Sequence, residues 1–200
     1  MIEAVVLAAG LSSRMGEPKP LVLIHGQPAL SHVLRTLKQA EVEEPIVVLG
    51  AAAEEIRKAV DLSDCRVLVN PAPESGLSTS LRLGLGAVGS DAAGALIVMS
   101  DMPALRPETI RSVITLADDG AQVAAPTFGG RRGFPVYLAR ALFAELAPTL
   151  AGDAGARAFL KRHPQLLKTV EVDDPGSVQD FDRPEDLTRF ERSTPCATSA

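Results

Sequence analysis

Two cationic residues follow a glycine-containing turn near the start of the chain. Residues 8–19 contain two glycines and several small residues, and the same segment carries Arg14 and Lys19. Glycine allows the backbone to approach a ligand closely, and consecutive backbone N–H groups in such a turn can bind an anion. Arg14 and Lys19 supply the positive charge that a triphosphate requires. A surface turn with two cations fits the spacing equally well, because neither the dinucleotide fingerprint nor the P-loop motif is present.

A carboxylate, Asp101, directly follows the apolar run at residues 95–99 and Ser100. At the end of a buried strand, a carboxylate is well placed to hold a hard cation such as Mg²⁺, which takes one or two carboxylates and keeps water ligands. Because Pro103 follows closely, the alternative is that Asp101 only starts a turn.

An acidic cluster at residues 180–186 contains Asp182, and Pro184 follows it. This pattern predicts the start of a helix, with Asp182 near the N-cap and Pro184 in the first turn. A carboxylate that caps a helix can also face a cleft, so a second role for Asp182 stays open.

Short apolar runs that alternate with helical periods must position these groups. Strands are predicted at residues 2–7, 46–49, 66–69, 95–99, 122–125 and 167–172, and helices at residues 28–39, 53–60, 77–88, 107–117, 138–146, 155–163 and 184–192. The alternation predicts an α/β, Rossmann-like fold with a mostly parallel central sheet and helices on both faces. The turn-rich residues 126–136 predict a small excursion or hairpin beside the sheet. Ligands of such sheets collect at the carboxyl ends of the strands.

The composition is that of an ordinary globular chain. Of its 200 residues, 46% are apolar and 22% charged, and the formal net charge is −5. We expect one domain at residues 1–192 and a flexible tail at residues 193–200. The acidic excess argues against nucleic acid as a partner. No apolar run approaches the roughly 20 residues that span a bilayer, which argues against a membrane partner.

The N-terminus lacks the features of a signal peptide, and Cys65 and Cys196 do not form a disulfide framework. We therefore expect a cytoplasmic protein. His25, His32 and His163 lack metal-ligand spacing and are predicted to be surface or core residues.

The run LAAGLSSRMGEPKPL, residues 7–21, resembles the signature of the cytidylyl- and guanylyltransferases that activate molybdopterin. These enzymes belong to a larger superfamily of sugar-phosphate nucleotidyltransferases. Further segments resemble the molybdenum cofactor cytidylyltransferase branch; they are residues 70–71 with 74–81, 101–103, 152–157 and 180–186. The resemblance covers residues 2–190.

The resemblance implies a role for each matching position. Backbone atoms at the end of the first strand would contact the nucleotide; these residues are Leu7, Ala8, Ala9 and Gly10. Further substrate contacts would come from Asn70, Gly76 and Ser80. Arg14 and Lys19 would grip phosphates, Asp101 would bind Mg²⁺, and Asp182 would be the second carboxylate.

The implied reaction is transfer of CMP from CTP to the terminal phosphate of molybdopterin, with release of pyrophosphate. A molybdenum hydroxylase would then receive the product cofactor. We expect CTP to be preferred over GTP because of Ala9. Guanylyltransferases of this superfamily have a motif similar to Leu-Ala-Gly-Gly here, with glycine at the position of Ala9. The Ala9 methyl group occupies space that the second ring of a purine could need.

One position departs from the branch pattern. Where the branch usually shows Gly-His-Pro, this chain has Phe134 between a glycine and a proline. An aromatic ring can pack on a flat pterin as a substrate contact, but it cannot donate a proton or titrate.

Two other functions remain open. A guanylyltransferase or sugar-phosphate nucleotidyltransferase of the same fold would share the first motif. A non-catalytic protein that binds molybdenum cofactor and inserts it into a hydroxylase could keep the fold while losing its catalytic cations. The presence of Arg14, Lys19 and Asp101 favours catalysis.

Overall fold

The computed structural model describes residues 1–10, 16–181 and 186. Its centre is an eight-stranded sheet with the strand order β10-β7-β9-β6-β1-β4-β5, and β8 pairs with β7. The strands are β1 (Ile2–Ala8), β4 (Ile46–Leu49), β5 (Arg66–Val69), β6 (Gly94–Met99), β7 (Val123–Phe128), β8 (Arg131–Arg132), β9 (Val136–Ala139) and β10 (Leu167–Glu171). Parallel pairing joins β6, β1, β4 and β5, and also β7 and β10. The prediction of a mostly parallel α/β sheet is therefore confirmed.

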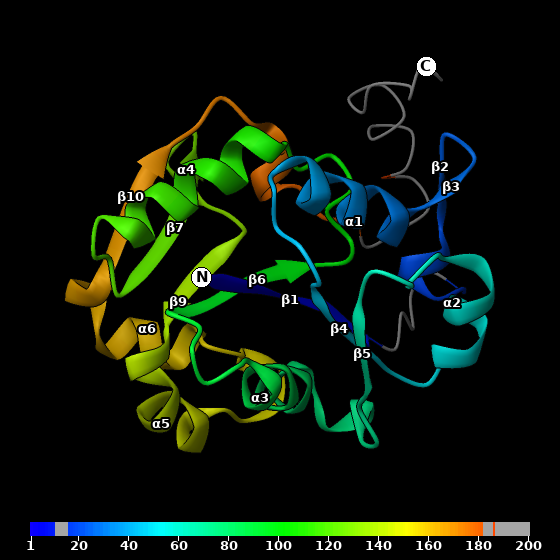
Figure 1. Ribbon diagram of the computed structural model, residues 1–200, viewed down its shortest axis with the longest axis horizontal. Coiled ribbons are helices and arrows are strands. Elements are labelled where there is room, and N and C mark those ends of the chain that lie inside the picture. Colours follow the sequence, from blue (N-terminus) through cyan, green and yellow to red (C-terminus); the bar gives the residue numbers. More distant parts are fainter. Residues whose placement is uncertain (11–15, 182–185, 187–200) are drawn as a thin grey trace.

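Helices cover both faces of this sheet (Figure 1). The helices are α1 (Ala29–Gln39), α2 (Ala53–Ala59), α3 (Leu77–Ala87), α4 (Pro107–Asp118), α5 (Phe143–Leu146) and α6 (Arg157–Arg162). Alternate residues of β1 point to opposite faces: Val6 packs in the core with α1, α2 and α4, and Val5 packs with α3, α5 and α6. Because both faces of the sheet are buried at its centre, β1, β4 and β6 are apolar at nearly every position, which explains their continuous apolar runs.

The predicted helix at residues 138–146 is wrong in its first half. Leu138 lies in β9, which runs antiparallel between β6 and β7, and it pairs with Ala95 and Val123. The ring of Tyr137 fills the space beside Gly94, where a Cβ atom would lie 2.6 Å from the ring. Tertiary packing thus selects a strand for this four-residue segment, which is too short to show a hydrophobic period. The remainder is helical, with a 3-10 turn at Arg140–Leu142 followed by α5.

Other boundaries differ less. The excursion predicted at residues 126–136 is a hairpin, in which β7 turns through Gly129 and Gly130 into β8. Helix α6 begins at Arg157 because Gly155, with φ +52°, lies in the left-handed region. A small hairpin of β2 (Leu23–Ile24) and β3 (Gln27–Pro28) was not predicted. The helix predicted at residues 184–192 and the tail at residues 193–200 lie outside the described residues, except for the helical residue 186. None of the described helices could span a bilayer.

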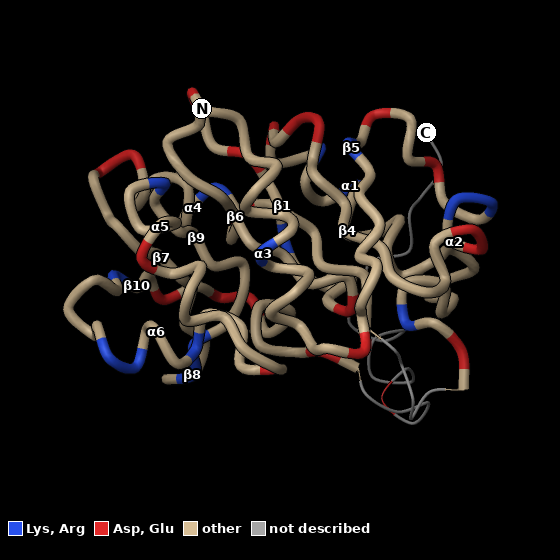
Figure 2. Tube along the Cα trace, turned by 90° about the horizontal axis from the view of Figure 1, so that it is seen from below, with Lys and Arg blue, Asp and Glu red and all other residues tan. Residues whose placement is uncertain are grey.

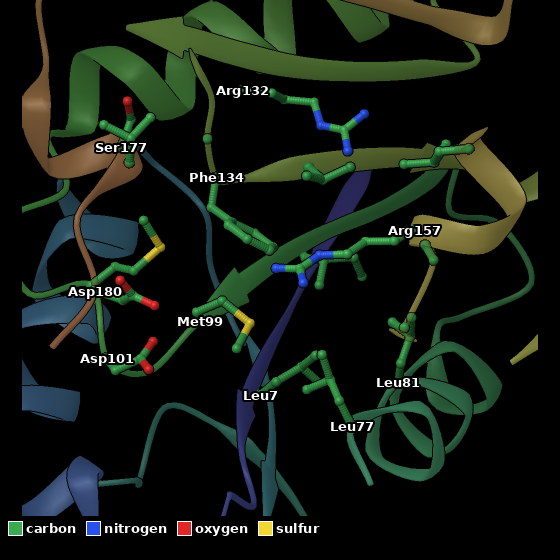
Figure 3. Close-up of a pocket in the computed structure, with 18 of the residues that line it drawn as sticks. Leu7, Leu77, Leu81, Met99, Asp101, Arg132, Phe134, Arg157, Ser177 and Asp180 are labelled. Atoms are coloured by element: carbon green, nitrogen blue, oxygen red, sulfur yellow. The ribbon is translucent and has the colours of Figure 1, made fainter. Parts of the chain in front are cut away.

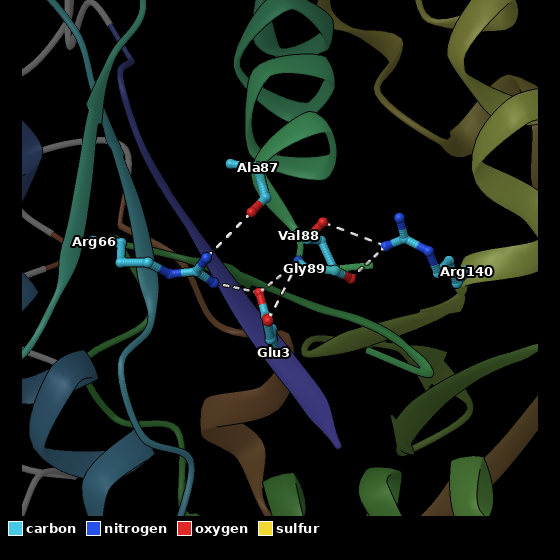
Figure 4. Close-up of polar contacts among 6 residues, drawn as sticks. All are labelled: Glu3, Arg66, Ala87, Val88, Gly89 and Arg140. Atoms are coloured by element: carbon cyan, nitrogen blue, oxygen red, sulfur yellow. Dashed lines mark hydrogen bonds and ion pairs between the residues drawn. The ribbon is translucent and has the colours of Figure 1, made fainter. Parts of the chain in front are cut away.

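A polar network fixes the C-terminal end of α3 (Figure 4). Arg66 donates to the Ala87 carbonyl oxygen at 3.2 Å and pairs with Glu3. Arg140 donates to the Gly89 carbonyl at 2.6 Å, and Glu3 accepts from the Gly89 N–H at 3.2 Å. Arginine side chains near the last carbonyls of a helix satisfy their unpaired acceptors and complement the helix dipole. The network ties α3 to β1 and β5, and so fixes the direction in which α3 presents its N-terminus.

A buried histidine joins α1 to the β2–β3 hairpin. His32 Nε2 lies 2.8 Å from the Ile24 carbonyl oxygen, to which it donates. Burial lowers the pKa of His32, with smaller lowering effects from Arg35 and His25, while the Ile24 hydrogen bond raises it. His32 is thus a core residue, one of the two alternatives predicted for the histidines.

We predict that His32→Gln weakens the acid sensitivity of folding. With its pKa lowered, His32 binds fewer protons in the folded state than in the unfolded chain, so the free energy of unfolding falls as the pH drops below about 6.5. Glutamine can still donate to Ile24 but does not titrate. Urea unfolding at several pH values between 7 and 5 should show a shallower slope for the variant. Equal slopes for the two proteins would contradict this account.

Candidate functional site

An ion pair joins the ends of β1 and β6 across the carboxyl edge of the sheet. Lys19 Nζ lies 2.9 Å from Asp101 Oδ2, and the two side chains are only 18% and 13% exposed. Lys19 begins a 3-10 turn in which Pro18 is the N-cap and Pro20 follows, so its backbone is held by two proline rings. The Lys19 ammonium also lies 5.7 Å from the centre of the Phe181 ring. The structure therefore brings Lys19, the predicted phosphate ligand, and Asp101, the predicted metal ligand, together at one edge of the sheet.

The pKa of Asp101 is raised even though Lys19 lies beside it. Burial raises the pKa of Asp101, the charge and hydrogen bond of Lys19 lower it, and the nearby Asp180 carboxylate raises it again by a smaller amount. The net direction is upward, so Lys19 compensates only part of the cost of burying this carboxylate. A second cation at the same point would stabilise the ionised form.

These donors fit Mg²⁺, which binds through one or two carboxylates and keeps water and phosphate ligands. In Figure 3, Asp101 and Asp180 lie next to each other at one end of a cavity. Among the residues with described positions, no group of three or more His, Cys, Asp or Glu side chains could enclose a metal. The fit is therefore to an open site completed by water and phosphate. Asp182, the predicted second carboxylate, and Arg14, the predicted second phosphate ligand, lie outside the described residues.

The cavity beside Asp101 has a volume of about 280 Å³ and an apolar floor. Leu7, Leu81 and Met99 contribute to this floor, and Phe134 stands at one side. Arg132 and Arg157 approach from the opposite side to the carboxylates, and Arg157 extends its guanidinium group toward the Phe134 ring (Figure 3). The cavity can therefore hold a molecule with an apolar or flat body and anionic groups.

The end of β1 separates this cavity from a smaller one. Ala8 and Gly10 line a second space of about 220 Å³, together with residues of α2. The backbone of Ala9 packs closely on Gly50, where a Cβ atom would lie 2.6 Å from the Ala9 carbonyl oxygen. Of the predicted residues, the structure thus groups Leu7, Asp101 and Phe134 on one side of the strand end. Ala8 and Gly10 lie on the other side.

Asn70 and Ser80 lie together at the start of α3. Asn70 Nδ2 donates to Thr79 Oγ1 at 2.8 Å and to Ser80 Oγ at 2.9 Å, and its Oδ1 accepts from the Ala72 N–H at 3.0 Å. Both side chains are buried. These polar atoms hold the turn that leads into α3, so direct contact of Asn70 and Ser80 with substrate stays a prediction.

Gly76 packs against a second segment of chain. It has φ +97°, and a Cβ atom there would lie 2.5 Å from the Gly152 carbonyl carbon. Asp153 Oδ1 accepts from the Leu77 N–H at 3.2 Å, which caps the N-terminus of α3 from outside the helix. Gly76 thus allows residues 152–157 to pack against the start of α3. These residues lead into α6, which begins at Arg157.

Sequence reasoning gave no role to Arg132, Arg157 or Asp180. Arg157 and Asp180 belong to segments that match the resembling family, and that match was the available signal. Arg132 lies in the two-residue strand β8, whose position depends on pairing with β7. Figure 2 shows basic residues at β8 and α6, although the chain as a whole is acidic. Only the folded arrangement brings these cations to the cavity.

A lysine paired with a buried carboxylate lies at the carboxyl edge of a mostly parallel sheet, which is where α/β proteins bind their ligands. The chain belongs to the family of MobA-like NTP transferase domains, whose family profile matches residues 4–167. It is therefore an enzyme of a nucleotidyltransferase family with nucleotide substrates, and the family resemblance of its motifs is confirmed.

Solved structures of relatives agree with this membership. Rv0371c of Mycobacterium tuberculosis H37Rv is 32% identical, with a TM-score of 0.85 over 96% of this chain and 98% of the other. The same protein in complex with manganese is 30% identical, with a TM-score of 0.82 over 96% and 99% of the two chains. A nucleotidyl transferase of Methanothermobacter is 30% identical, with a TM-score of 0.81 over 96% of both chains. A divalent metal is thus bound in a relative.

One relative of similar length is named as an oxidoreductase rather than a transferase. Nicotine blue oxidoreductase of Paenarthrobacter nicotinovorans is 28% identical over 197 residues, which cover 94% of this chain and 96% of that protein.

We predict that Lys19→Met weakens nucleotide binding. Methionine keeps the aliphatic stem and removes the ammonium group, and hydrogen bonds to charged groups contribute about 1.5–3 kcal/mol, or roughly 10–100-fold in affinity. Calorimetric titration with MgCTP at several salt concentrations should also show a weaker salt dependence for the variant. Lys38→Met is the matched control, because Lys38 is 79% exposed and pairs with Asp64 away from the site. Wild-type affinity in Lys19→Met would remove this lysine from the phosphate site.

Proposed function

We propose that this protein transfers CMP from CTP to the terminal phosphate of a molybdopterin-type acceptor and releases pyrophosphate. The observation that carries the proposal is the Lys19–Asp101 pair beside a cavity with an apolar floor, a flanking aromatic ring and two arginines. The pair suits phosphate and metal chemistry, and the cavity suits a flat anionic acceptor. The choice of CTP and of molybdopterin rests on the motif resemblance.

Charge balance supports a role for the pair in the reaction. Without ligands, the Lys19 ammonium compensates Asp101. A nucleotide with its metal brings an anion for the ammonium and a cation for the carboxylate, so both charges keep partners when substrate binds. Asp101 would hold Mg²⁺, with Asp182 as the proposed second carboxylate and Asp180 as the neighbouring acidic group. Mg²⁺ supplies neutralisation of phosphate charge.

The protein's own residues then have mainly positioning and electrostatic roles. Lys19, with Arg14, would stabilise the charge that develops on the leaving pyrophosphate. The N–H groups at the end of β1 would bind the nucleotide. Arg157 and Arg132 would hold the acceptor's anionic groups, while Phe134 packs on its flat part. The acceptor phosphate attacks the α-phosphorus directly, so the reaction needs no covalent bond to the enzyme.

The product would pass to a molybdenum hydroxylase, and we place the reaction in the cytoplasm. The alternatives share the fold: a guanylyltransferase, a sugar-phosphate nucleotidyltransferase, or a protein that only binds and inserts the cofactor. The name of the Paenarthrobacter relative adds a redox reaction as a further candidate.

A single assay separates these functions. Pyrophosphate release is measured with each of the four NTPs, with and without a molybdopterin acceptor or a sugar phosphate. Our proposal requires release that depends on both CTP and molybdopterin. Preference for GTP or for a sugar phosphate selects the corresponding transferase. A carrier protein or an oxidoreductase would release no pyrophosphate under any of these conditions.

We predict that wild type prefers CTP to GTP and that Ala9→Gly reduces this preference. Removal of one methyl group from a pocket changes discrimination by about 1–3 kcal/mol, so the change in the kcat/KM ratio should be about 10- to 200-fold and leave partial selectivity. Ala40→Gly controls for the loss of a buried methyl group, because Ala9 and Ala40 are 6% and 5% exposed. An unchanged ratio in Ala9→Gly would show that another group selects the base.

A further inference from the structure

One segment contacts three separate parts of the chain that carry side chains of the site. Residues 174–181, here called the strap, follow β10 and pass the carboxyl edge of the sheet. The strap contacts the loop after β6, which carries Asp101, and the turn before β9, which carries Phe134. It ends beneath Lys19. The contacts of each part are specific.

The first part of the strap is anchored by Asp174, whose side chain is buried. Asp174 Oδ2 accepts from the Arg106 N–H at 3.0 Å and from Thr109 Oγ1 at 2.7 Å. Its Oδ1 accepts from the Gly176 N–H at 2.9 Å. A buried carboxylate with three donors is costly to move, because each broken bond leaves a buried polar group without a partner. Asp174 therefore fixes the strap to the start of α4, where the Asp101 loop ends.

The middle of the strap fills the space between two backbones. A Cβ atom on Gly176 would lie 2.2 Å from the Ala104 carbonyl oxygen, in the Asp101 loop. A Cβ atom on Gly133 would lie 2.1 Å from the Ser177 carbonyl oxygen, which also accepts from the Phe134 N–H at 2.8 Å. Neither glycine lies in the left-handed region. Glycine is required at both positions by close approach alone, one on each side of the strap.

The end of the strap reaches the remaining groups of the site. Asp180 borders the cavity and lies beside Asp101 (Figure 3). Phe181 is fully buried in a small cluster with Val22 and Ile24, next to the Lys19 ammonium. A shift of the strap would therefore change the positions of Asp101, Phe134 and Lys19 relative to one another.

We propose that the strap sets the spacing between the metal end and the acceptor end of the site, with Asp174 as its positioning residue and Gly133 and Gly176 as its two contact points. This proposal rests on the proposed function for the acceptor, but not for the metal, whose binding can be measured without turnover. If the strap had a purely structural role, substitutions in its contacts would change the thermal midpoint but would leave both the metal affinity and the acceptor KM unchanged.

The test compares Gly176→Ala and Gly133→Ala with Gly86→Ala. The control adds a methyl group to α3 where no atom lies within 4 Å. Mn²⁺ binding to each ligand-free protein is measured by electron paramagnetic resonance, and acceptor KM by pyrophosphate release. Far-UV circular dichroism and thermal unfolding confirm that each variant is folded.

The two variants should give different signatures. In Gly176→Ala the Asp101 loop is displaced, because Asp174 holds the strap, so the Kd for Mn²⁺ should rise about 10- to 100-fold, as for loss of other groups that orient metal ligands. In Gly133→Ala the turn at Phe134 yields, because Asp174 holds the strap. Its Kd for Mn²⁺ should stay within about twofold of wild type, as for an independent site, while its acceptor KM rises.

Folded Gly176→Ala with wild-type Mn²⁺ affinity would overturn the proposal, as would wild type that binds no Mn²⁺. If Gly176→Ala does not fold, Thr109→Val takes its place, since it removes one donor to Asp174 without added bulk. Thr109→Ser, which keeps the hydroxyl group, should then restore Mn²⁺ affinity. Mn²⁺ affinities that differ as expected in a protein without CTP turnover would support the strap and contradict the proposed function.

Discussion

The site depends on one constraint: a carboxylate must stay ionised while it is largely removed from water. Asp101 meets this constraint through Lys19, whose ammonium lies 2.9 Å away. The compensation is partial, because burial still raises the pKa of Asp101 above its ordinary value. A residue in this state favours a second cation, and a lysine in this state favours an anion. Under the proposed function, substrate with its metal would provide both.

The fold keeps this pair in place by fixing what surrounds it. Lys19 and Asp101 lie beyond the carboxyl ends of β1 and β6, which are neighbours in the sheet. The Glu3–Arg66–Arg140 network fixes the opposite end of α3. The strap crosses the remaining loops. The carboxyl end of the sheet holds the buried ion pair and the two cavities.

The sequence predicted features that depend on local pattern. Continuous apolar runs predicted the parallel strands, and the positions of Lys19 and Asp101 after such runs predicted that both lie in loops at the carboxyl ends of strands. It did not predict β9, because four residues between two strands have no period of their own. It assigned Asn70 and Ser80 to substrate, which stays a prediction, and it did not show that their polar atoms bond to each other. The roles of Arg132, Asp174 and Gly133 could not be predicted from sequence patterns, since their partners lie in distant segments.

The most direct test of the central claim is the turnover of Asp101→Asn at saturating Mg²⁺ and CTP, measured as pyrophosphate release. Asparagine keeps the size and removes the charge. We predict a fall of at least about a hundredfold, the scale for loss of one electrostatic contact to the transition state, with an unchanged or higher thermal midpoint. Asp64→Asn, at an exposed ion pair, should keep wild-type turnover. Near-normal turnover of Asp101→Asn would contradict the role of this pair in catalysis.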